Sequence, residues 1–304
     1  MYACLKYSKM RQIFVTGATG EIGLVLVEEL SKKYLVTALC REKIPSSINN
    51  PNIEWVKGDI LHLEAFESKL EKKDVIIHLA ALTRSTNPKK LYEANVQATK
   101  VILEKAKEKK CTKAIVFSSA SVTQKWLTPY AKSKKQMEKA IDSIEGMEIV
   151  IVRPTIVYGK NSKYIQNAKR MISLPLPFIP LPENGSADMR PVHVRDVAKS
   201  ILAILEKFPK KKTTFDIAFP EPFTLCQTMQ FIAQNKKIRK KCFSPIPSFI
   251  ILFIQKMADR NFPLPRILIS WASAENGYTV DPTPLLKQYS LRFTPPEEGI
   301  LESL

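Results

Sequence analysis

Histidine, glycine and long hydrophobic runs are all scarce in this chain of 304 residues. No stretch reaches the roughly 18 apolar residues that a transmembrane helix needs, and residues 1–10 lack the apolar core of a signal peptide. The three histidines and five cysteines show no metal-ligand spacing such as CxxC. We therefore expect no metal site, reduced cysteines and a cytoplasmic location, with attachment to a membrane surface left open.

Acidic residues are also few: the chain has 29 Asp and Glu against 47 Lys and Arg, so its formal net charge is +18. Cations gather at residues 207–212 and 236–241. We interpret them as solvated surface. Because residues 249–254 are apolar, we interpret that stretch as an amphipathic element of a smaller lobe that packs over the substrate cleft, with docking to anionic headgroups as the alternative. No recognition motif accompanies the charge, so nucleic acid is not expected.

Three of only nine glycines fall within seven residues, at Gly17, Gly20 and Gly23. A strand pattern at 13–15 precedes them and a helical pattern at 21–30 follows, which is the context of a dinucleotide-binding turn. The N–H groups at the helix start then hold phosphates. No Gly-Lys-Ser/Thr follows, which argues against an NTPase P-loop. The residues expected to bind the dinucleotide are Gly17, Thr19, Gly20, Glu21, Ile22 and Gly23.

Short apolar runs alternate with helical patterns along most of the chain. Continuous apolar strands between helices indicate a parallel sheet covered on both faces. We expect an α/β fold, a Rossmann doubly wound sheet in residues 10–160 plus 191–220, with a smaller substrate-binding lobe in 161–190 plus 221–304. The expected strands are 13–15, 35–39, 53–56, 75–79, 114–117, 149–152, 192–194 and 215–218, and the clearest helices are 91–109 and 130–144.

A Tyr-x-x-x-Lys pair, Tyr130 and Lys134, begins the helix that follows the fifth strand. Residues four apart share one helix face, so the lysine charge can lie near the phenol. A nearby cation favours the phenolate and lowers the tyrosine pKa, which suits a general acid or base beside a carbonyl or alcohol.

Together these features resemble the extended short-chain dehydrogenase/reductases, the NAD-dependent epimerase/dehydratase family, from about Met10 to near the C-terminus. The matching elements, in order, are the glycine turn, Gly58-Asp59-Ile60, His78-Leu-Ala-Ala81, Asn95-Val96, Ser118-Ser119, Tyr130 with Lys134, Arg153-Pro154 through Gly159, and His193-Val-Arg-Asp196.

The resemblance implies roles for residues outside the glycine turn. Asp59 and Ile60 would contact adenine, and Ala80 and Ala81 would line the dinucleotide groove. Pro154 would pack near the nicotinamide. The implied catalytic residues are Ser119, which would hold the reacting oxygen, Tyr130, which would exchange the proton, and Lys134, which would hold the nicotinamide ribose. We expect His78 and His193 to be structural.

Departures from the family pattern narrow this expectation. Ala120 and Ser121 stand where dehydratases carry acidic residues, so dehydration is disfavoured. Met189 stands where nucleotide-sugar members often carry arginine. Arg41 follows the second strand, where an acid would select NAD, so NADP(H) is favoured over NAD(H).

Two activities remain open. The first is an NAD(P)(H)-dependent oxidoreductase or epimerase acting on a carbonyl or alcohol, with a nucleotide sugar among the candidate substrates. The second is an NADP(H)-binding scaffold or assembly protein with little turnover, because residues 191–196 and 275–299 resemble the branch of the NADPH-binding accessory subunit of respiratory complex I. The expected partner is a small-molecule substrate, and peripheral membrane contact and a homodimer are left open.

Overall fold

The computed structural model describes residues 10–45, 48–160, 162–243, 247, 249–250, 253, 256–257 and 277–304. The chain divides into two compact units. The first is Met1–Ser118, Ser133–Val152 and Ala198–Phe215, and the second is Ser119–Lys132, Arg153–Val197 and Asp216–Leu304. The domain boundaries expected from the sequence stay a prediction, and residues 1–9 and 275–276 lie outside the described part.

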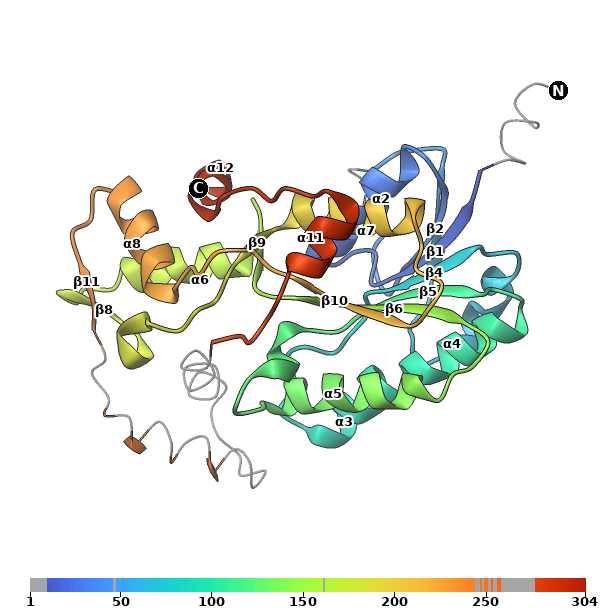
Figure 1. Ribbon diagram of the computed structural model, residues 1–304, viewed down its shortest axis with the longest axis horizontal. Helices are drawn as coiled ribbons and strands as arrows, with labels where there is room; N and C mark the ends of the chain where they lie inside the picture. The colour runs from blue at the N-terminus through green and yellow to red at the C-terminus, as the bar shows by residue number, and fades with distance from the viewer. Residues whose placement is uncertain are drawn as a thin grey trace. The chain divides into compact units, whose positions relative to one another are not determined.

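A parallel sheet of seven strands forms the centre of the first unit, in the order β10-β6-β5-β4-β1-β2-β3 (Figure 1). The chain builds β1, β2 and β3 outward on one side and then returns to β4 beside β1. This reversal creates the switch point at which α/β sheets bind ligands. The strands are β1 (Gln12–Thr16), β2 (Leu35–Cys40), β3 (Ile53–Lys57), β4 (Val75–His78), β5 (Lys113–Phe117), β6 (Glu148–Pro154) and β10 (Thr213–Ile217).

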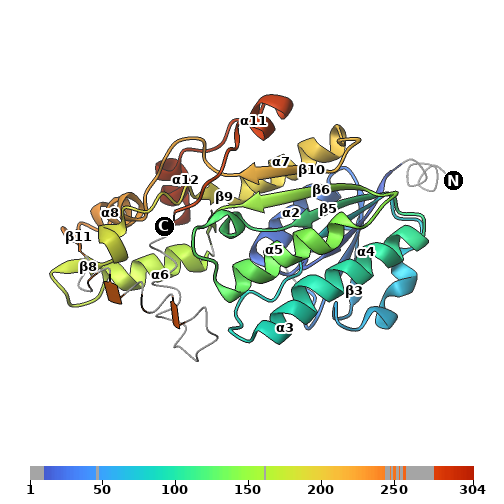
Figure 2. The same ribbon diagram turned by 60° about the horizontal axis from the view of Figure 1, so that its bottom comes forward.

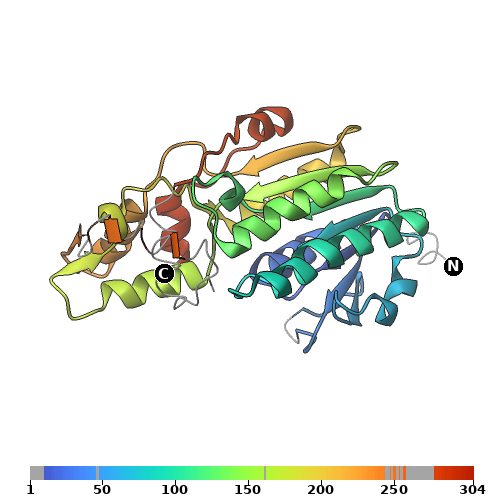
Figure 3. The same cartoon turned by 90° about the horizontal axis from the view of Figure 1, so that it is seen from below.

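Helices cover both faces of this sheet (Figures 2 and 3). On one face Phe14, Ile76 and Val116 pack against Ile102 and Met137, and all five are buried. Strand residues between them, such as Ile13, point to the opposite face and are equally buried. The helices on one face are α3 (Pro88–Tyr92), α4 (Ala98–Glu108) and α5 (Pro129–Asp142). Those on the other face are α2 (Glu21–Ser31) and α7 (Val194–Glu206). The short 3-10 helices η1 (Leu63–Ala65) and η2 (Glu67–Leu70) and the π-helical segment η3 (Glu93–Gln97) complete the helical elements described in the unit.

The Rossmann sheet expected from the sequence is confirmed, with strand ends within a few residues of the predicted ones. One predicted strand is wrong in its place. Residues 192–194 contribute β9 (Val192–His193), which pairs with β7 (Val157–Tyr158) in a separate two-stranded sheet of the second unit. A run of two strand residues gives no sequence signal for its partner, because pairing depends on where the chain returns.

The second unit has its own apolar core. Tyr158, Ile165, Ile179, Met229 and Ile300 are buried in it, and they come from segments far apart in the chain. Its remaining elements are η4 (Ala120–Thr123), α6 (Lys163–Ile172), β8 (Phe178–Pro180), η5 (Pro182–Gly185), α8 (Leu225–Asn235), β11 (Lys241–Phe243), α11 (Thr283–Tyr289) and α12 (Pro296–Ser303).

The cysteine chemistry differs from the expectation. Cys226, in the first turn of α8, is joined to Cys242 of β11 by a disulfide, with the two Cα atoms 6.0 Å apart. Cys40 and Cys111 are free and buried. The prediction of reduced cysteines is therefore wrong for this pair, because scattered cysteines carry no pairing signal until β11 brings the chain back beside α8.

The apolar stretch 249–254 also departs from the favoured interpretation. Its described side chains are exposed, Phe249 to 70%, Ile250 to 37% and Phe253 to 62%. The expected packing on a lobe is absent at these three positions. Among the helices of the described residues, none combines the length and apolarity required to cross a bilayer.

Candidate cofactor and catalytic site

The glycine turn joins β1 to α2 in the first unit. Gly17 has a φ of +68°, and a Cβ on it would lie 2.7 Å from the Ala80 nitrogen. A Cβ on Gly23 would overlap the Gly17 carbonyl oxygen, so α2 packs closely over the turn. Gly20 is the N-cap of α2, and no side chain caps this helix end. The turn therefore presents a helix N-terminus suited to a pyrophosphate, with Thr19, Gly20 and Glu21 exposed and Ile22 partly buried beside it.

Beneath this turn, a chain of hydrogen bonds fixes the start of the β4 loop. The Ala80 N–H donates to Thr16 Oγ1 (3.2 Å), and Thr16 Oγ1 is 2.9 Å from His78 Nδ1. His78 Nε2 is 3.0 Å from Thr99 Oγ1, whose hydroxyl donates to the Asn95 carbonyl (2.8 Å). Because the Thr99 hydrogen is used there, His78 carries its proton on Nε2 and accepts from Thr16. Burial and the nearby Lys134 charge lower the pKa of His78 to about 3, so it is neutral and structural.

Asn95 extends this network to the residues that follow β4. Its Oδ1 accepts from the Leu82 N–H (2.7 Å), and its Nδ2 donates to the Leu82 carbonyl (3.0 Å) and to Ser133 Oγ (2.9 Å). Thr16 thus anchors Ala80 and Asn95 anchors Leu82, which fixes the backbone at Ala80 and Ala81 from both sides. Both alanines remain partly exposed. The sequence identified Asn95 only as a matching residue, since a buried amide shows no pattern that would reveal its partners.

The predicted adenine-end residues lie at one edge of the sheet. Cys40 and Lys57 are register partners, and the Gly58 N–H donates to the Cys40 carbonyl (2.9 Å). Arg41 and Asp59 therefore follow neighbouring strand ends, Arg41 exposed and Asp59 partly buried. Ile60 is partly buried in the next position.

Lys134 lies on α5 with its side chain inside the first unit. Its exposed fraction is 2%, and Nζ donates to the Phe117 carbonyl at the end of β5 (2.7 Å). Burial lowers the pKa of this ammonium to about 8, opposed by the neighbouring Glu138 carboxylate. The lysine thus sits at the carboxyl end of a central strand, where an α/β sheet binds its ligand.

Ser119 and Tyr130 belong to the second unit, where the structure brings them together. A side-chain hydrogen bond joins them. Ser119 Oγ accepts from the N–H (3.2 Å) and hydroxyl (2.9 Å) of Ser121, so its own hydrogen is left for Tyr130. Pro154, at the end of β6, is buried in the same unit.

The structure does not show the expected effect of Lys134 on the pKa of Tyr130. Burial raises the pKa of Tyr130 to about 12, and the Ser119 hydrogen bond opposes it. The one-turn spacing places Lys134 on the same helix, but its ammonium is engaged by the Phe117 carbonyl. The prediction of a lowered tyrosine pKa is therefore wrong.

Tyr278 lies near both Tyr130 and Tyr164 in the second unit, and sequence reasoning missed Tyr164 and Tyr278. Burial, together with Tyr164 and Tyr130, raises the pKa of Tyr278. Its segment is tied down by hydrogen bonds from the Tyr278 N–H to the Asp188 carbonyl (3.0 Å) and from the Thr279 N–H to Thr123 Oγ1 (3.1 Å). No spacing rule relates such distant positions, so only the folded chain reveals them.

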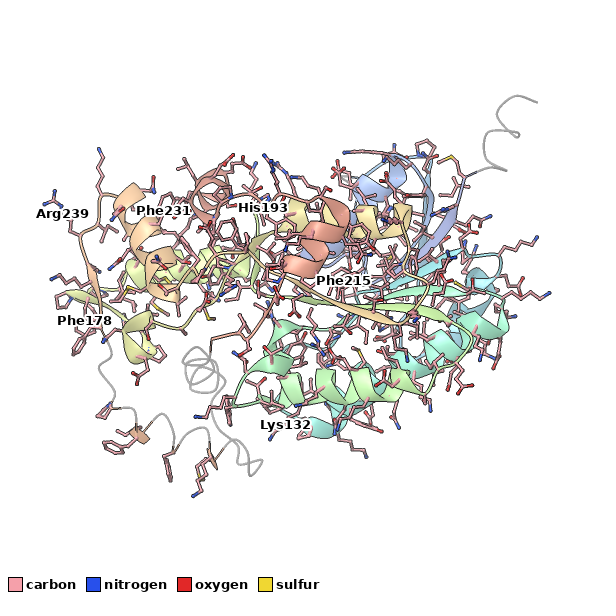
Figure 4. All side chains as sticks on the ribbon, in the orientation of Figure 1. Lys132, Phe178, His193, Phe215, Phe231 and Arg239 are labelled. Carbon is pink, nitrogen blue, oxygen red and sulfur yellow. A yellow bond between two sulfur atoms is a disulfide. The ribbon has the colours of Figure 1, made fainter. Side chains whose placement is uncertain are left out.

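His193 is part of the packing of the second unit, as expected (Figure 4). Its ring lies edge-on to Tyr158, 5.4 Å between centroids, and both side chains are buried. Asp196 of the same motif is buried and accepts from the Thr294 N–H (2.7 Å). The motif therefore holds β9 and the C-terminal segment in place.

A surface hollow of the first unit lies away from all these residues. It is at the amino ends of β4 and β5 and is lined by Arg11, Lys73, Asp74, Val75, Lys110, Thr112 and Lys113. The motif residues of the first unit follow the opposite, carboxyl ends of the strands.

Gly17 has no room for a side chain, which makes Gly17→Ala a direct test. We expect dinucleotide affinity to fall at least about tenfold and unfolding free energy to drop by about 1–3 kcal/mol, because the left-handed φ and the overlap with Ala80 act together. Gly146→Ala is the matched control, since Gly146 has a φ of +70° but its Cβ would meet only the Lys107 side chain at 3.4 Å. Calorimetric titration with NADH and thermal unfolding measure both effects. Equal affinity in the two variants would contradict the assigned turn.

The doubly wound sheet, the glycine turn over β4 and the Ser–Tyr pair define a dinucleotide-binding α/β protein of the short-chain dehydrogenase type. Residues 13–218 match the model of the NAD dependent epimerase/dehydratase family. The chain belongs to that family.

Similar proteins include both enzymes and a subunit of a respiratory complex. NADH dehydrogenase [ubiquinone] 1 alpha subcomplex subunit 9, mitochondrial, of Dictyostelium discoideum is 27% identical over 80% of this chain and 68% of its own length. UDP-glucose 4-epimerase of Vibrio cholerae is 30% identical over 57% of this chain and 61% of its own. The structure of MoeE5 in complex with UDP-glucuronic acid and NAD superimposes with a TM-score of 0.74, at 19% identity, over 96% of this chain and 97% of that one, which shows the same fold.

Proposed function

We propose that the protein is an NAD(P)(H)-dependent oxidoreductase or epimerase that acts on a carbonyl or alcohol carbon. The observation that carries this is the hydrogen-bonded Ser119–Tyr130 pair, with Lys134 one helical turn further along α5. A proton donor aligned by a second hydroxyl is what the reduction of a carbonyl requires.

The chain's own residues would handle the proton. With a pKa of about 12, Tyr130 is a neutral phenol at physiological pH and can donate a proton to an alkoxide as it forms. Ser119 directs its one hydroxyl hydrogen toward Tyr130 and would turn it to the reacting oxygen when the substrate binds. Lys134, released from the Phe117 carbonyl, would bind ribose hydroxyls and bring a positive charge toward the phenol.

A nicotinamide dinucleotide fits the described residues, because the uncapped start of α2 and the glycines of the turn leave room and N–H donors for its phosphates. The group supplies or accepts the hydride when bound. The proposed binding residues are Gly17, Thr19, Gly20, Glu21, Ile22, Gly23, Arg41, Asp59, Ile60, Ala80, Ala81, Lys134 and Pro154.

Arg41 supports NADP(H) over NAD(H), because it is an exposed cation directly after β2. Arg41→Ala should weaken NADPH binding by about 1.5–3 kcal/mol, the range for charge-assisted hydrogen bonds, and leave NADH binding nearly unchanged. Titration of each cofactor against wild type and variant measures this. The neighbouring Lys43→Ala is the control for general charge, and equal wild-type affinity for both cofactors would contradict the preference.

The substrate class is proposed only coarsely. The Vibrio cholerae relative is named for a nucleotide sugar, which supports a sugar nucleotide as one candidate. Met189 is buried where such enzymes often carry an arginine, which supports a carbonyl compound without a diphosphate as the other. Ala120 and Ser121 are buried and provide no acid, so dehydration stays disfavoured. A homodimer is left open, and the cytoplasmic location stays a prediction whose premise of reduced cysteines fails for Cys226 and Cys242.

The alternative is a cofactor-binding scaffold or assembly protein with little turnover. It is supported by the likeness to the Dictyostelium subunit, which is named as part of an NADH dehydrogenase. The same Ser119, Tyr130 and Lys134 would then position the cofactor without reaction.

Absorbance at 340 nm, followed with NADPH or NADH and a panel of carbonyl compounds and nucleotide sugars, separates the two functions. Turnover with any member of the panel supports the enzyme. Tight cofactor binding without turnover across the panel, together with co-purification of a protein complex, supports the scaffold.

A further inference from the structure

Two segments of the second unit contain basic residues but no acidic ones. Residues 160–182 contain four Lys and Arg, residues 222–258 contain six, and neither segment contains Asp or Glu. These segments fold into α6, β8, α8 and β11, whose apolar residues share one core. The two segments therefore contribute ten positive charges and no carboxylate to the second unit, whose acidic residues, such as Glu183 and Glu221, lie outside them.

The small sheet of β8 and β11 turns apolar side chains outward. The two strands pair in parallel, with Ile179 opposite Cys242. Ile179 is fully buried, and Cys242 packs toward the core and is bonded to Cys226. The alternate residues point away, so the rings of Phe178 and Phe243 meet edge-on, 5.1 Å between centroids, and Phe243 is 51% exposed.

The loop before β8 adds to this surface. Leu174 and Leu176 are both exposed. Lys240 Nζ donates to the Ile172 carbonyl (2.9 Å) and to the Leu174 carbonyl (2.5 Å), which fixes the loop beside β11. Figure 4 labels Phe178 and Arg239 at this same end of the second unit.

Of the twelve large hydrophobic side chains exposed among the described residues, Leu174, Leu176 and Phe243 belong to this loop or to β11. We call this surface the basic–apolar face and define it by Leu174, Leu176, Phe178 and Phe243 together with Lys236, Lys237, Arg239, Lys240 and Lys241.

We propose that the basic–apolar face binds the surface of a bilayer that contains anionic phospholipids. A solvated basic surface alone would not account for the exposed Phe243, Leu174 and Leu176 beside it, whereas cations around an apolar patch match both the headgroup and the acyl layer of a membrane surface. The lysines attract the headgroups while Phe178 and Phe243 enter the headgroup–acyl boundary. This inference is independent of the catalytic proposal, because none of these residues belongs to the cofactor or catalytic set.

Co-sedimentation of the full chain with vesicles tests the proposal. We expect salt-sensitive binding to vesicles of phosphatidylcholine with phosphatidylglycerol, and little binding to phosphatidylcholine alone. A variant with Lys236→Gln, Lys237→Gln, Arg239→Gln and Lys241→Gln should bind at least about 100-fold more weakly, since each cation near such a surface contributes about fivefold. Lys240 is left intact because it holds the Leu174 loop.

The matched control removes the same charge from the first unit, through Lys89→Gln, Lys90→Gln, Lys210→Gln and Lys211→Gln, all at exposed positions. It should bind vesicles nearly as wild type does. NADH titration and thermal unfolding show that both variants remain folded.

A second readout detects the apolar contact. Phe243→Trp introduces an indole whose emission should shift to the blue on anionic vesicles and be quenched by brominated lipid, measured as a difference from the three native tryptophans. The proposal is overturned if the protein does not bind anionic vesicles at low salt, or if the two charge variants bind them equally. It is also overturned if the emission of the Phe243→Trp variant is unchanged on vesicles and added RNA displaces the protein from them, because the basic residues would then bind a nucleic acid in preference to lipid.

Discussion

Tyr130→Phe should lower kcat by about 10²–10⁴ on any substrate that the wild type turns over, while cofactor affinity stays within a few-fold. The phenol supplies the proton, and phenylalanine keeps the ring that fills the partly buried position. The hydroxyl shares a hydrogen bond with Ser119, which is a modest loss, so we expect a small change in stability. Steady-state kinetics and NADPH titration on the same preparation measure the two effects.

Ser119→Ala and Tyr289→Phe accompany this variant. Ser119→Ala removes the donor to the phenol and should also lower kcat, with a further upward shift in the pKa of Tyr130. Tyr289 lies on α11, where its hydroxyl accepts from Gln288 (3.2 Å), so Tyr289→Phe should keep wild-type activity. Equal turnover in Tyr130→Phe and Tyr289→Phe would remove Tyr130 from the mechanism.

The sequence predicted best those features that rest on local patterns. Gly17, Gly20 and Gly23 lie between an apolar strand and a helix, and the structure gives Gly17 the positive φ and Gly23 the close packing that the pattern requires. The central strands were visible because strands buried on both faces read as continuous apolar runs. Tyr130 and Lys134 were found from a spacing on one helix.

Features that depend on long-range packing were not visible in the sequence. β9 pairs with β7 because of the path that the chain takes, and Cys226 meets Cys242 because β11 returns beside α8. The rise in the pKa of Tyr130 has the same origin, since burial acts through groups that surround the ring and not through its sequence neighbours.

Lys134→Met should abolish most activity and yet make the ligand-free protein more stable at neutral pH. Burial lowers the pKa of Lys134 from about 10.5 to about 8, so the folded chain holds an ammonium at a cost of about 3 kcal/mol. Methionine fills the same space without the charge. The Phe117 carbonyl loses its donor in the variant, which costs about 1 kcal/mol of stability. A net gain of about 2 kcal/mol in unfolding free energy remains below pH 8.

The pH dependence identifies the charge as the cause. Between pH 8 and about 10.5 the unfolded state binds more protons at this lysine than the folded state does, so the stability of the wild type rises with pH across that window. The advantage of Lys134→Met should therefore shrink as the pH approaches 10. Chemical unfolding of both proteins from pH 7 to 10 measures it, with Lys132→Met, at an exposed position on the same helix, as the control. If the difference in unfolding free energy between wild type and Lys134→Met stayed constant with pH, the folded state would not lower the pKa of Lys134. The cost of burying its ammonium beside the Phe117 carbonyl could then not explain the stability of the variant.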